Sequence, residues 1–189
     1  MKIDPPQLLY QVKVTLQETD PPVWRRLLVR SDTTLLQMHR ILQVAMGWKD
    51  YHLHEFRAGA VLFGESDPDY GVRRISEKAT FLADVLRKVD DRLEYEYDFG
   101  DSWEHEILLE EITELDPDAM YPVVVAGERA CPPEDVGGTE GYRNFLRAIA
   151  DPGDPEHDEY LVWCGGSYDP DKFDASSINM ILERRRMQR

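Results

Sequence analysis

The sequence predicts an α+β fold, in which a β-grasp (ubiquitin-like) core with a mixed sheet is extended by a long β-hairpin and C-terminal helices. The first observation is the order of hydrophobic periodicities: hairpin, helix, two strands, short helix, strand, which is the order of a β-grasp core. The second is size, because 189 residues with 42% apolar content are enough for one core. We expect one domain over 1–189, with the sheet core at about 8–115. An extra strand, a Cys-Pro-Pro loop and C-terminal helices are expected over 116–189.

The first hairpin follows from strict alternation. Between residues 10 and 17, apolar side chains alternate with polar ones, which is typical of a half-buried strand. The segment 19–22 reads Thr-Asp-Pro-Pro and predicts a turn, after which 23–30 returns as a second strand.

The first helix has recognisable ends. Thr34 and Gln37 fit a capping box, and Gly47 fits the C-terminal stop. One apolar stripe with helical spacing is made of Leu35, Met38, Leu42, Ala45 and Met46. Strands are then predicted at 51–57 and 61–63, followed by a short helix at 81–87.

A long hairpin comes next. Apolar residues alternate with acids over 93–99 and again over 103–109, and Gly100–Ser102 suits a three-residue loop. With that loop, Phe99 lies opposite Trp103 and Tyr97 opposite His105, all on the core face.

The same register makes acids meet on the other face of this hairpin. Asp98 would face Glu104, and Glu96 would face Glu106, and such like-charged pairs destabilise a sheet. A cation, a basic partner or splaying of the side chains into water would each relieve the repulsion.

The remaining elements are read from their caps and turns. We expect a strand at 121–126, a Pro/Gly loop over 127–138 and a helix capped by Thr139. A short helix over 159–163 stops at Gly165-Gly166, and the final helix starts near Asp174.

Charge is unevenly placed along the chain, whose formal net charge is -15. Residues 1–88 carry 13 basic and 11 acidic side chains, whereas 89–189 carry 9 basic and 26 acidic ones. The acidic second half repels phosphate backbones, so we expect no direct nucleic-acid binding through it. A solvated acidic face, a cation site and a basic protein partner all stay open. The arginines that end the last helix suit its C-terminal dipole.

Location is predicted from absent signals and few cysteines. No apolar run approaches the roughly 20 residues that span a bilayer, so no membrane contact is expected. The first residues show no signal-peptide core, and Cys131 and Cys164 are too few for a disulfide framework. We expect a cytoplasmic protein with reduced thiols.

His52 and His54 form an H-x-H pair. On a strand both side chains would point to one face, where they could share a divalent metal such as zinc. A third ligand would be needed, from His105, Cys131, Glu134 or Asp135; the metal set favoured here is His52, His54 and Cys131. The alternative is that both histidines bond within the sheet or line a groove.

The stretch from Ala130 to Gly138 is the least generic in the chain. It places the Cys131 thiol beside a diproline, Glu134 and Asp135, ahead of two glycines. Nearby carboxylates raise a thiol pKa, which argues against a reactive thiolate and favours a structural loop packed on the hairpin. His105 on its aromatic face is best read as a satisfied core histidine, with a site role as the alternative.

Several ordered motifs together resemble one family, the plasmid pRiA4b ORF-3-like proteins. The matching segments, over about 10–185, are Pro21–Arg26, Leu35–Trp48, His52–Phe56, Tyr97–His105, Cys131–Tyr142, Tyr168–Pro170 and Phe173–Asn179. The resemblance implies a protein carried on plasmids and insertion elements, and it supplies no catalytic residues to carry over.

The sequence therefore favours a non-catalytic binding or accessory module that acts through protein contacts, with a basic protein as partner. The alternative is a metal-dependent hydrolase or nuclease built on His52/His54, Asp98–His105 and Cys131–Asp135. Whether the chain is an enzyme stays open. The expected binding groove is lined by Trp24, His52, His54, Asp98, Asp101, Trp103, His105, Cys131, Glu134, Asp135 and Tyr142.

Overall fold

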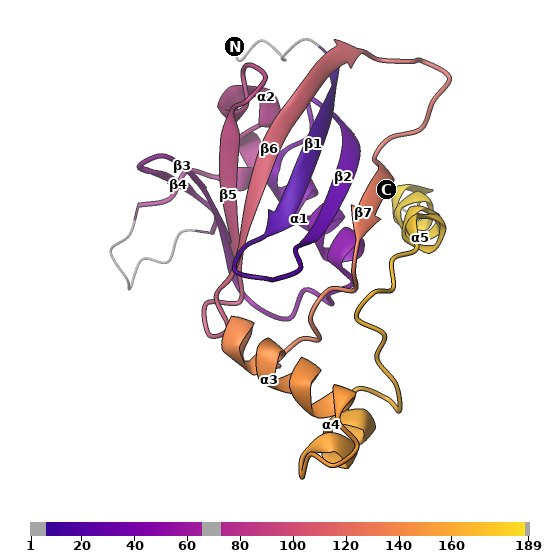
Figure 1. The fold of residues 1–189 in the computed structure, drawn as a ribbon. Coiled ribbons are helices and arrows are strands. Elements are labelled where there is room, and N and C mark those ends of the chain that lie inside the picture. The colour runs from indigo at the N-terminus through magenta and orange to yellow at the C-terminus, as the bar shows by residue number, and fades with distance from the viewer. Residues whose placement is uncertain (1–6, 66–72, 188–189) are drawn as a thin grey trace.

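A computed structural model describes residues 7–65 and 73–187 and shows one curved sheet with helices around it (Figure 1). The strands are β1 (Leu8–Leu16), β2 (Val23–Arg30), β3 (His54–Ala58), β4 (Val61–Phe63), β5 (Arg92–Tyr97), β6 (Trp103–Glu114) and β7 (Val123–Glu128). The α-helices are α1 (Leu35–Met46), α2 (Leu82–Val85), α3 (Gly138–Ala150), α4 (His157–Trp163) and α5 (Ala175–Met187). The strand order is β4-β3-β5-β6-β1-β2-β7, which confirms the predicted α+β class.

The first hairpin and helix match their sequence signals. β1 and β2 pair without interruption from Leu9–Arg30 to Leu16–Val23. At the start of α1, the Thr34 hydroxyl accepts the Gln37 N–H at 3.2 Å, and the Gln37 amide oxygen accepts the Thr34 N–H at 2.9 Å. Gly47 ends the helix with a φ of 89°, a left-handed conformation that favours glycine.

The predicted mixed sheet is wrong, because all six pairs of strands are antiparallel. The predicted β-grasp core would place β5 parallel beside β1. Instead the long return strand β6 pairs with β5 on one side and with β1 on the other, so it lies between them. The β-grasp core is therefore not confirmed.

The predicted register of the β5–β6 hairpin is also wrong, because its loop is longer than three residues. Tyr97 pairs with Trp103 and Tyr95 with His105, which leaves 98–102 outside the ladder. Asp98 and Ser102 adopt φ values of 58° and 53°, and the Ser102 N–H closes the loop on the Asp98 carbonyl at 2.6 Å. Phe99 consequently lies on the surface, 43% exposed, and not on the core face.

Acids do meet across this hairpin, in the pairs Glu94–Glu106 and Glu96–Glu104. Arg57 of β3 lies 3.4 Å from Glu94 and 3.7 Å from Glu96, and Arg92 pairs with Glu106. The repulsion expected from the sequence is thus relieved by arginines of the same sheet, a relief that the sequence reading did not include.

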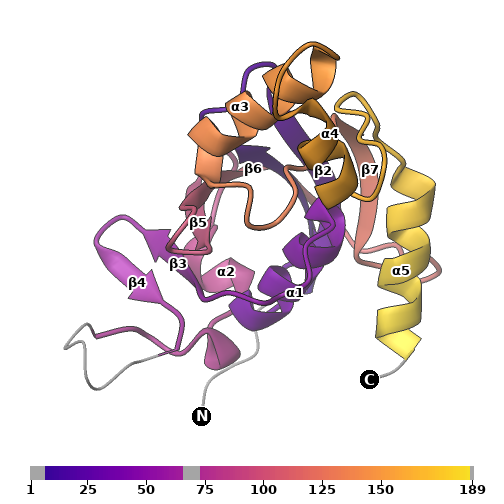
Figure 2. The same ribbon diagram turned by 90° about the horizontal axis from the view of Figure 1, so that it is seen from below.

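The core lies between the sheet and α1. Seen from below, the sheet curves around α1, while α3 and α4 lie across one end of it (Figure 2). The largest fully buried side chains include Trp103, Tyr95, Tyr97 and Phe56 from the sheet and Leu35, Met38 and Leu42 from α1. Among the helices of the described residues, none has the length and apolar character needed to cross a membrane.

The Asn179 side chain of the last helix bonds to the edge of the sheet. Strand β7 pairs with β2, and α5 lies along the outer side of β7 (Figures 1 and 2). The Asn179 amide oxygen accepts the Val124 N–H at 2.7 Å, and its amide nitrogen donates to the Val124 carbonyl at 2.8 Å. The side chain thus pairs with the strand as a neighbouring peptide group would.

Candidate functional site

The segment between β7 and α3 docks on the loop of the β5–β6 hairpin. The Gly137 N–H donates to the Asp101 carboxylate at 3.1 Å. At Gly138, a Cβ would lie 2.6 Å from the Asp101 carbonyl oxygen, so only glycine permits this approach. The indole N–H of Trp48 donates to the Pro132 carbonyl at 3.0 Å. The diproline segment is therefore held against the end of α1 as well as the hairpin.

Glu134 is the polar anchor of this loop. Its carboxylate accepts the Tyr97 hydroxyl at 2.8 Å and the Lys49 N–H at 3.0 Å. The Tyr97 oxygen in turn accepts the Tyr51 N–H at 3.1 Å. Burial, followed by the Glu134 carboxylate, raises the pKa of Tyr97 well above its ordinary value, so the phenol stays a donor to Glu134.

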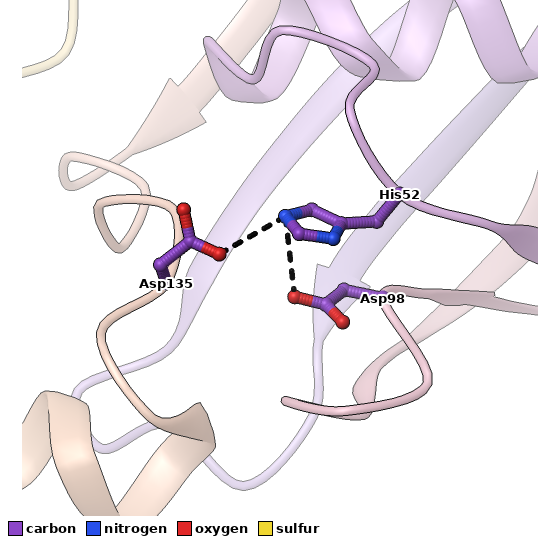
Figure 3. A group of neighbouring side chains, drawn as sticks. All are labelled: His52, Asp98 and Asp135. Carbon is purple, nitrogen blue, oxygen red and sulfur yellow. Dashed lines mark ion pairs between the residues drawn. The ribbon is translucent and has the colours of Figure 1, made fainter.

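His52, Asp98 and Asp135 converge next to this anchor (Figure 3). The Nε2 atom of His52 lies 3.1 Å from Asp135 and 3.6 Å from Asp98, and the ligand atoms of the three side chains lie within 4.8 Å of one another. This Nε2 atom is shielded from solvent, yet it makes no well-formed hydrogen bond with any residue that the structure describes. The three groups come from three separate segments of the chain.

Local backbone geometry aims the two aspartates. Asp98 and Asp135 adopt φ values of 58° and 60°, a left-handed conformation that aspartate tolerates better than most residues. One Asp98 oxygen accepts the Gly100 N–H at 3.0 Å, which leaves the other oxygen to face His52. Asp135 directly follows the anchored Glu134 and is 66% exposed in its side chain. The site is therefore preorganised on one side and open to water on the other.

This arrangement suits two states. A protonated His52 would be held between two carboxylates, closing the loop onto the hairpin electrostatically. Alternatively, one imidazole and two carboxylates can hold a divalent cation, with solvent in the remaining positions, as in catalytic metal sites. Both states use the same three side chains.

His54 does not join His52, which corrects the expected H-x-H pair. Strand β3 begins only at His54, so the two side chains do not share a strand face. The ring of His54 stacks on His39 of α1, with centroids 3.5 Å apart, and its Nε2 atom lies 2.8 Å from Glu77. His39 contacts Asp50 and the Tyr95 hydroxyl, each at 2.8 Å.

Cys131 does not join His52 either, so the expected set of His52, His54 and Cys131 does not assemble. Burial raises the pKa of the Cys131 thiol to about 12, which agrees with the inert role favoured by the sequence. Its carbonyl accepts the Tyr168 hydroxyl at 3.1 Å, and Tyr168 also contacts the buried Tyr142 at 3.0 Å. Cys131 and Tyr142 therefore belong to the packing behind the loop.

The other expected groove residues lie elsewhere. Trp103 and His105 are buried in the core, and His105 Nδ1 lies 2.9 Å from the Trp103 carbonyl oxygen. Trp24 lies next to Lys13 and Arg26, whose charged groups are 5.0 and 5.2 Å from its ring. Of the expected set, only His52, Asp98, Asp101, Glu134 and Asp135 meet at the hairpin loop.

A cavity of about 270 Å³ adjoins Asp135 on the side of α4. We call it the acidic cavity, and it is lined by Asp135, Val136, Glu156, Glu159, Tyr160 and Trp163. Within the described part of the chain, neither Glu156 nor Glu159 forms an ion pair. Three carboxylates and two aromatic rings thus surround one hollow.

Sequence reasoning missed several residues that shape this region. His39 lies one position after Met38 within the apolar pattern of α1, a placement that could have marked it as buried. Trp48 directly follows the helix stop at Gly47, where a hydrophobic side chain often packs back on the helix. Glu156 and Glu159 stand in a linker-like acidic segment, and nothing local indicates that they face Asp135.

Comparisons with known proteins find one family model and two similar proteins. A family model described as plasmid pRiA4b ORF-3-like protein matches residues 8–177. Uncharacterized protein y4hQ of Sinorhizobium fredii (strain NBRC 101917 / NGR234) is 39% identical over 175 residues, 92% of this chain and 90% of the relative. The crystal structure of MM3350, titled a protein of unknown function, from Methanosarcina mazei Go1, has a TM-score of 0.81 and 34% identity. It covers 90% of this chain and 97% of that one.

Proposed function

We propose that this chain, which belongs to the plasmid pRiA4b ORF-3-like family, is a non-catalytic binding module. In this proposal, the acidic cavity holds a basic segment of a protein partner. Location in the cytoplasm and association with mobile elements stay predictions.

The observation that carries this proposal is the lining of the acidic cavity. Glu156 and Glu159 have no cationic partner among the described residues, so a lysine or arginine side chain from outside would find unpaired carboxylates. Tyr160 and Trp163 add ring faces that attract a cation placed over them. Chemistry of this kind selects a basic side chain over an acidic or a purely apolar one.

Helix α4 supports a docking role. None of its residues is buried, Val162 is 81% exposed and Trp163 is 46% exposed. Exposed aromatic and aliphatic side chains beside unpaired charges are typical of contact surfaces. The negative charge of the second half would also speed the approach of a basic partner.

The first prediction concerns a fluorescein-labelled Gly-Lys repeat peptide of twelve residues, measured by fluorescence polarisation at fixed ionic strength. We expect the double substitution Glu156→Gln and Glu159→Gln to weaken binding about tenfold, because each removes a charged acceptor. Asp135 is left intact in this variant, so the neighbouring histidine site keeps its ligands.

The matched control is Glu111→Gln with Glu114→Gln, which removes the same charge from two exposed acids at the end of β6. We expect this control to change affinity less than twofold, since its carboxylates lie outside the acidic cavity. Equal weakening in both double variants would reveal diffuse attraction to an acidic protein and would contradict the proposal. The variant Trp163→Ala keeps the carboxylates of the acidic cavity, so it measures the aromatic contribution to peptide affinity apart from that of charge.

A second function is favoured by the unbonded Nε2 atom of His52. A divalent cation held by His52, Asp98 and Asp135 would satisfy that nitrogen and both facing oxygens. Such an ion, when bound, lowers the pKa of its water and supplies the nucleophile of a hydrolase or nuclease. Asp98 would be oriented for this by Gly100, and Asp135 by the anchored Glu134.

The second prediction tests that site by metal removal. Untagged protein purified without chelator should carry about one equivalent of zinc or manganese by mass spectrometry. Treatment with EDTA should lower the Tm by about 5–10 °C, the effect of losing a ligand present at roughly 100 times its Kd.

His52→Gln and Asp98→Asn should each lose the metal and the EDTA effect, whereas Asp118→Asn, in an exposed turn, should keep both. A metal-free preparation whose Tm does not respond to EDTA or to added zinc would refute the metal site. In that case His52 would serve to hold the loop of Asp135 next to the loop of Asp98 without a metal ion.

A further inference from the structure

A third feature shares no residue with the two sites above and does not rest on the proposed function. It is a cavity of about 240 Å³ between α1, α5 and the segment that leads into β7. Figure 2 shows α5 alongside α1 and β7. The residues that line the cavity come from α1, α5 and the segments before α1 and β7. Four arginines line it, Arg30, Arg40, Arg185 and Arg186, and we call it the arginine pocket.

The arginine pocket carries an excess of positive charge in a chain of net charge -15. Its one acid, Asp32, accepts two hydrogen bonds from the Arg30 guanidinium group, at 2.9 and 2.7 Å. Arg40, Arg185 and Arg186 form no ion pair with any residue in the ranges 7–65 and 73–187. Arg186 donates to the Met120 sulfur at 2.7 Å. Guanidinium groups without a carboxylate partner beside one hollow favour the binding of an anion there.

The pocket has polar donors as well as charge. Thr33 and Gln37 line it at the start of α1, where the helix dipole adds positive potential. The dipole at the end of α5 accounts for arginines in that turn, but it does not account for Arg40, which comes from another helix. Residues from separate parts of the chain therefore bring positive charge to the same pocket.

The floor of the pocket is apolar. Ile41, Val44 and Leu182 are each largely buried there, and Tyr121 and Pro122 complete one wall. A bare anion would leave this floor uncovered, whereas a ligand with an apolar body would cover it. The volume lies just below the roughly 300–1,000 Å³ of sites for drug-sized ligands, so the occupant is small.

We infer that the arginine pocket binds a small phosphate ester, with its phosphate among the unpaired arginines and its organic part over Ile41, Val44 and Leu182. Guanidinium groups match phosphate oxygens in pairs, and a dianion balances more than one of them.

The test is isothermal titration of the full chain with phenyl phosphate at fixed ionic strength. We expect saturable binding of one equivalent, weakened about tenfold by Arg40→Gln and about tenfold by Arg185→Gln. Inorganic phosphate should bind more weakly than phenyl phosphate, because it leaves the apolar floor uncovered.

Arg184→Gln is the matched control, since Arg184 shares the last turn of α5, lies outside the arginine pocket and contacts Met180. It should bind phenyl phosphate as the parent chain does, and circular dichroism should show all variants folded. Absence of saturable binding, equal weakening by Arg184→Gln, or tighter binding of succinate than of phenyl phosphate would each overturn the inference.

Discussion

Gly141→Ala should destabilise the protein by about 3 kcal/mol or more, and lower its Tm by roughly 6–12 °C. A Cβ at this position would lie 2.0 Å from the Val136 carbonyl oxygen, a backbone atom that no side-chain rotation can move. Gly141 is in the first turns of α3, and Val136 directly follows Asp135. The helix and the loop must therefore separate to accept one methyl group.

Two readouts distinguish this effect from ordinary glycine strain. Thermal unfolding should show the loss of stability, and binding of the Gly-Lys peptide should weaken because Asp135 and Val136 line the acidic cavity. Gly47→Ala is the control: it has a positive φ of 89° but open space around the new Cβ, so about 1 kcal/mol is expected. A Gly141→Ala protein that melts within 2 °C of the parent would show that α3 does not press on Val136.

Stability should fall steeply as the pH is lowered from about 6.5 to about 4. Burial, followed by the charge of nearby His54, lowers the pKa of His39 to about 4 against the opposing effect of Asp50. Burial likewise lowers the pKa of His105 to about 4. In the unfolded chain both would titrate near 6.5.

The sign follows from proton binding. Between pH 6.5 and 4 the unfolded state binds more protons than the folded state, so the free energy of unfolding rises with pH. The stabilisation is complete above about 6.5, and each histidine contributes a loss of about 3 kcal/mol by pH 4. Carboxylates with lowered pKa, such as Glu110, lose their contribution only as the pH falls below about 4.5.

Urea unfolding at pH 7, 6 and 5 measures this directly. His105→Phe should remove about half of the slope, because it deletes one of the two buried imidazoles while filling the same space between Trp48 and Tyr95. An equal free energy of unfolding at pH 7 and pH 5 in the parent chain would contradict the prediction.

Short sequence patterns, such as caps and alternation, predicted most of the helices and strands. They did not predict which distant strands pair. The ends of α1 were readable because Thr34, Gln37 and Gly47 act within their own helix. The register of the β5–β6 hairpin was not, because Asp98 and Ser102 adopt a left-handed backbone that lengthens the loop. The position of β6 next to β1 depends on a long-range choice that periodicity does not encode.

The candidate site was predictable in composition but not in grouping. His52, Asp98 and Asp135 were all expected groove residues, yet their convergence depends on how two loops meet. The H-x-H spacing suggested shared coordination by His52 and His54, and this failed because the strand starts between them. The part played by Glu156 and Glu159 depends on the packing of α4 beside the loop, which the sequence does not reveal.

The pairing of Asn179 with Val124 bears on whether the sheet can pair with another chain. An edge strand offers unpaired N–H and C=O groups to any other chain, and edge-to-edge pairing of that kind leads to aggregation. Along β7 the helix α5 stands where another strand would dock, and the Asn179 amide occupies both polar groups of Val124. The helix and this amide together cover the border of the sheet at Val124.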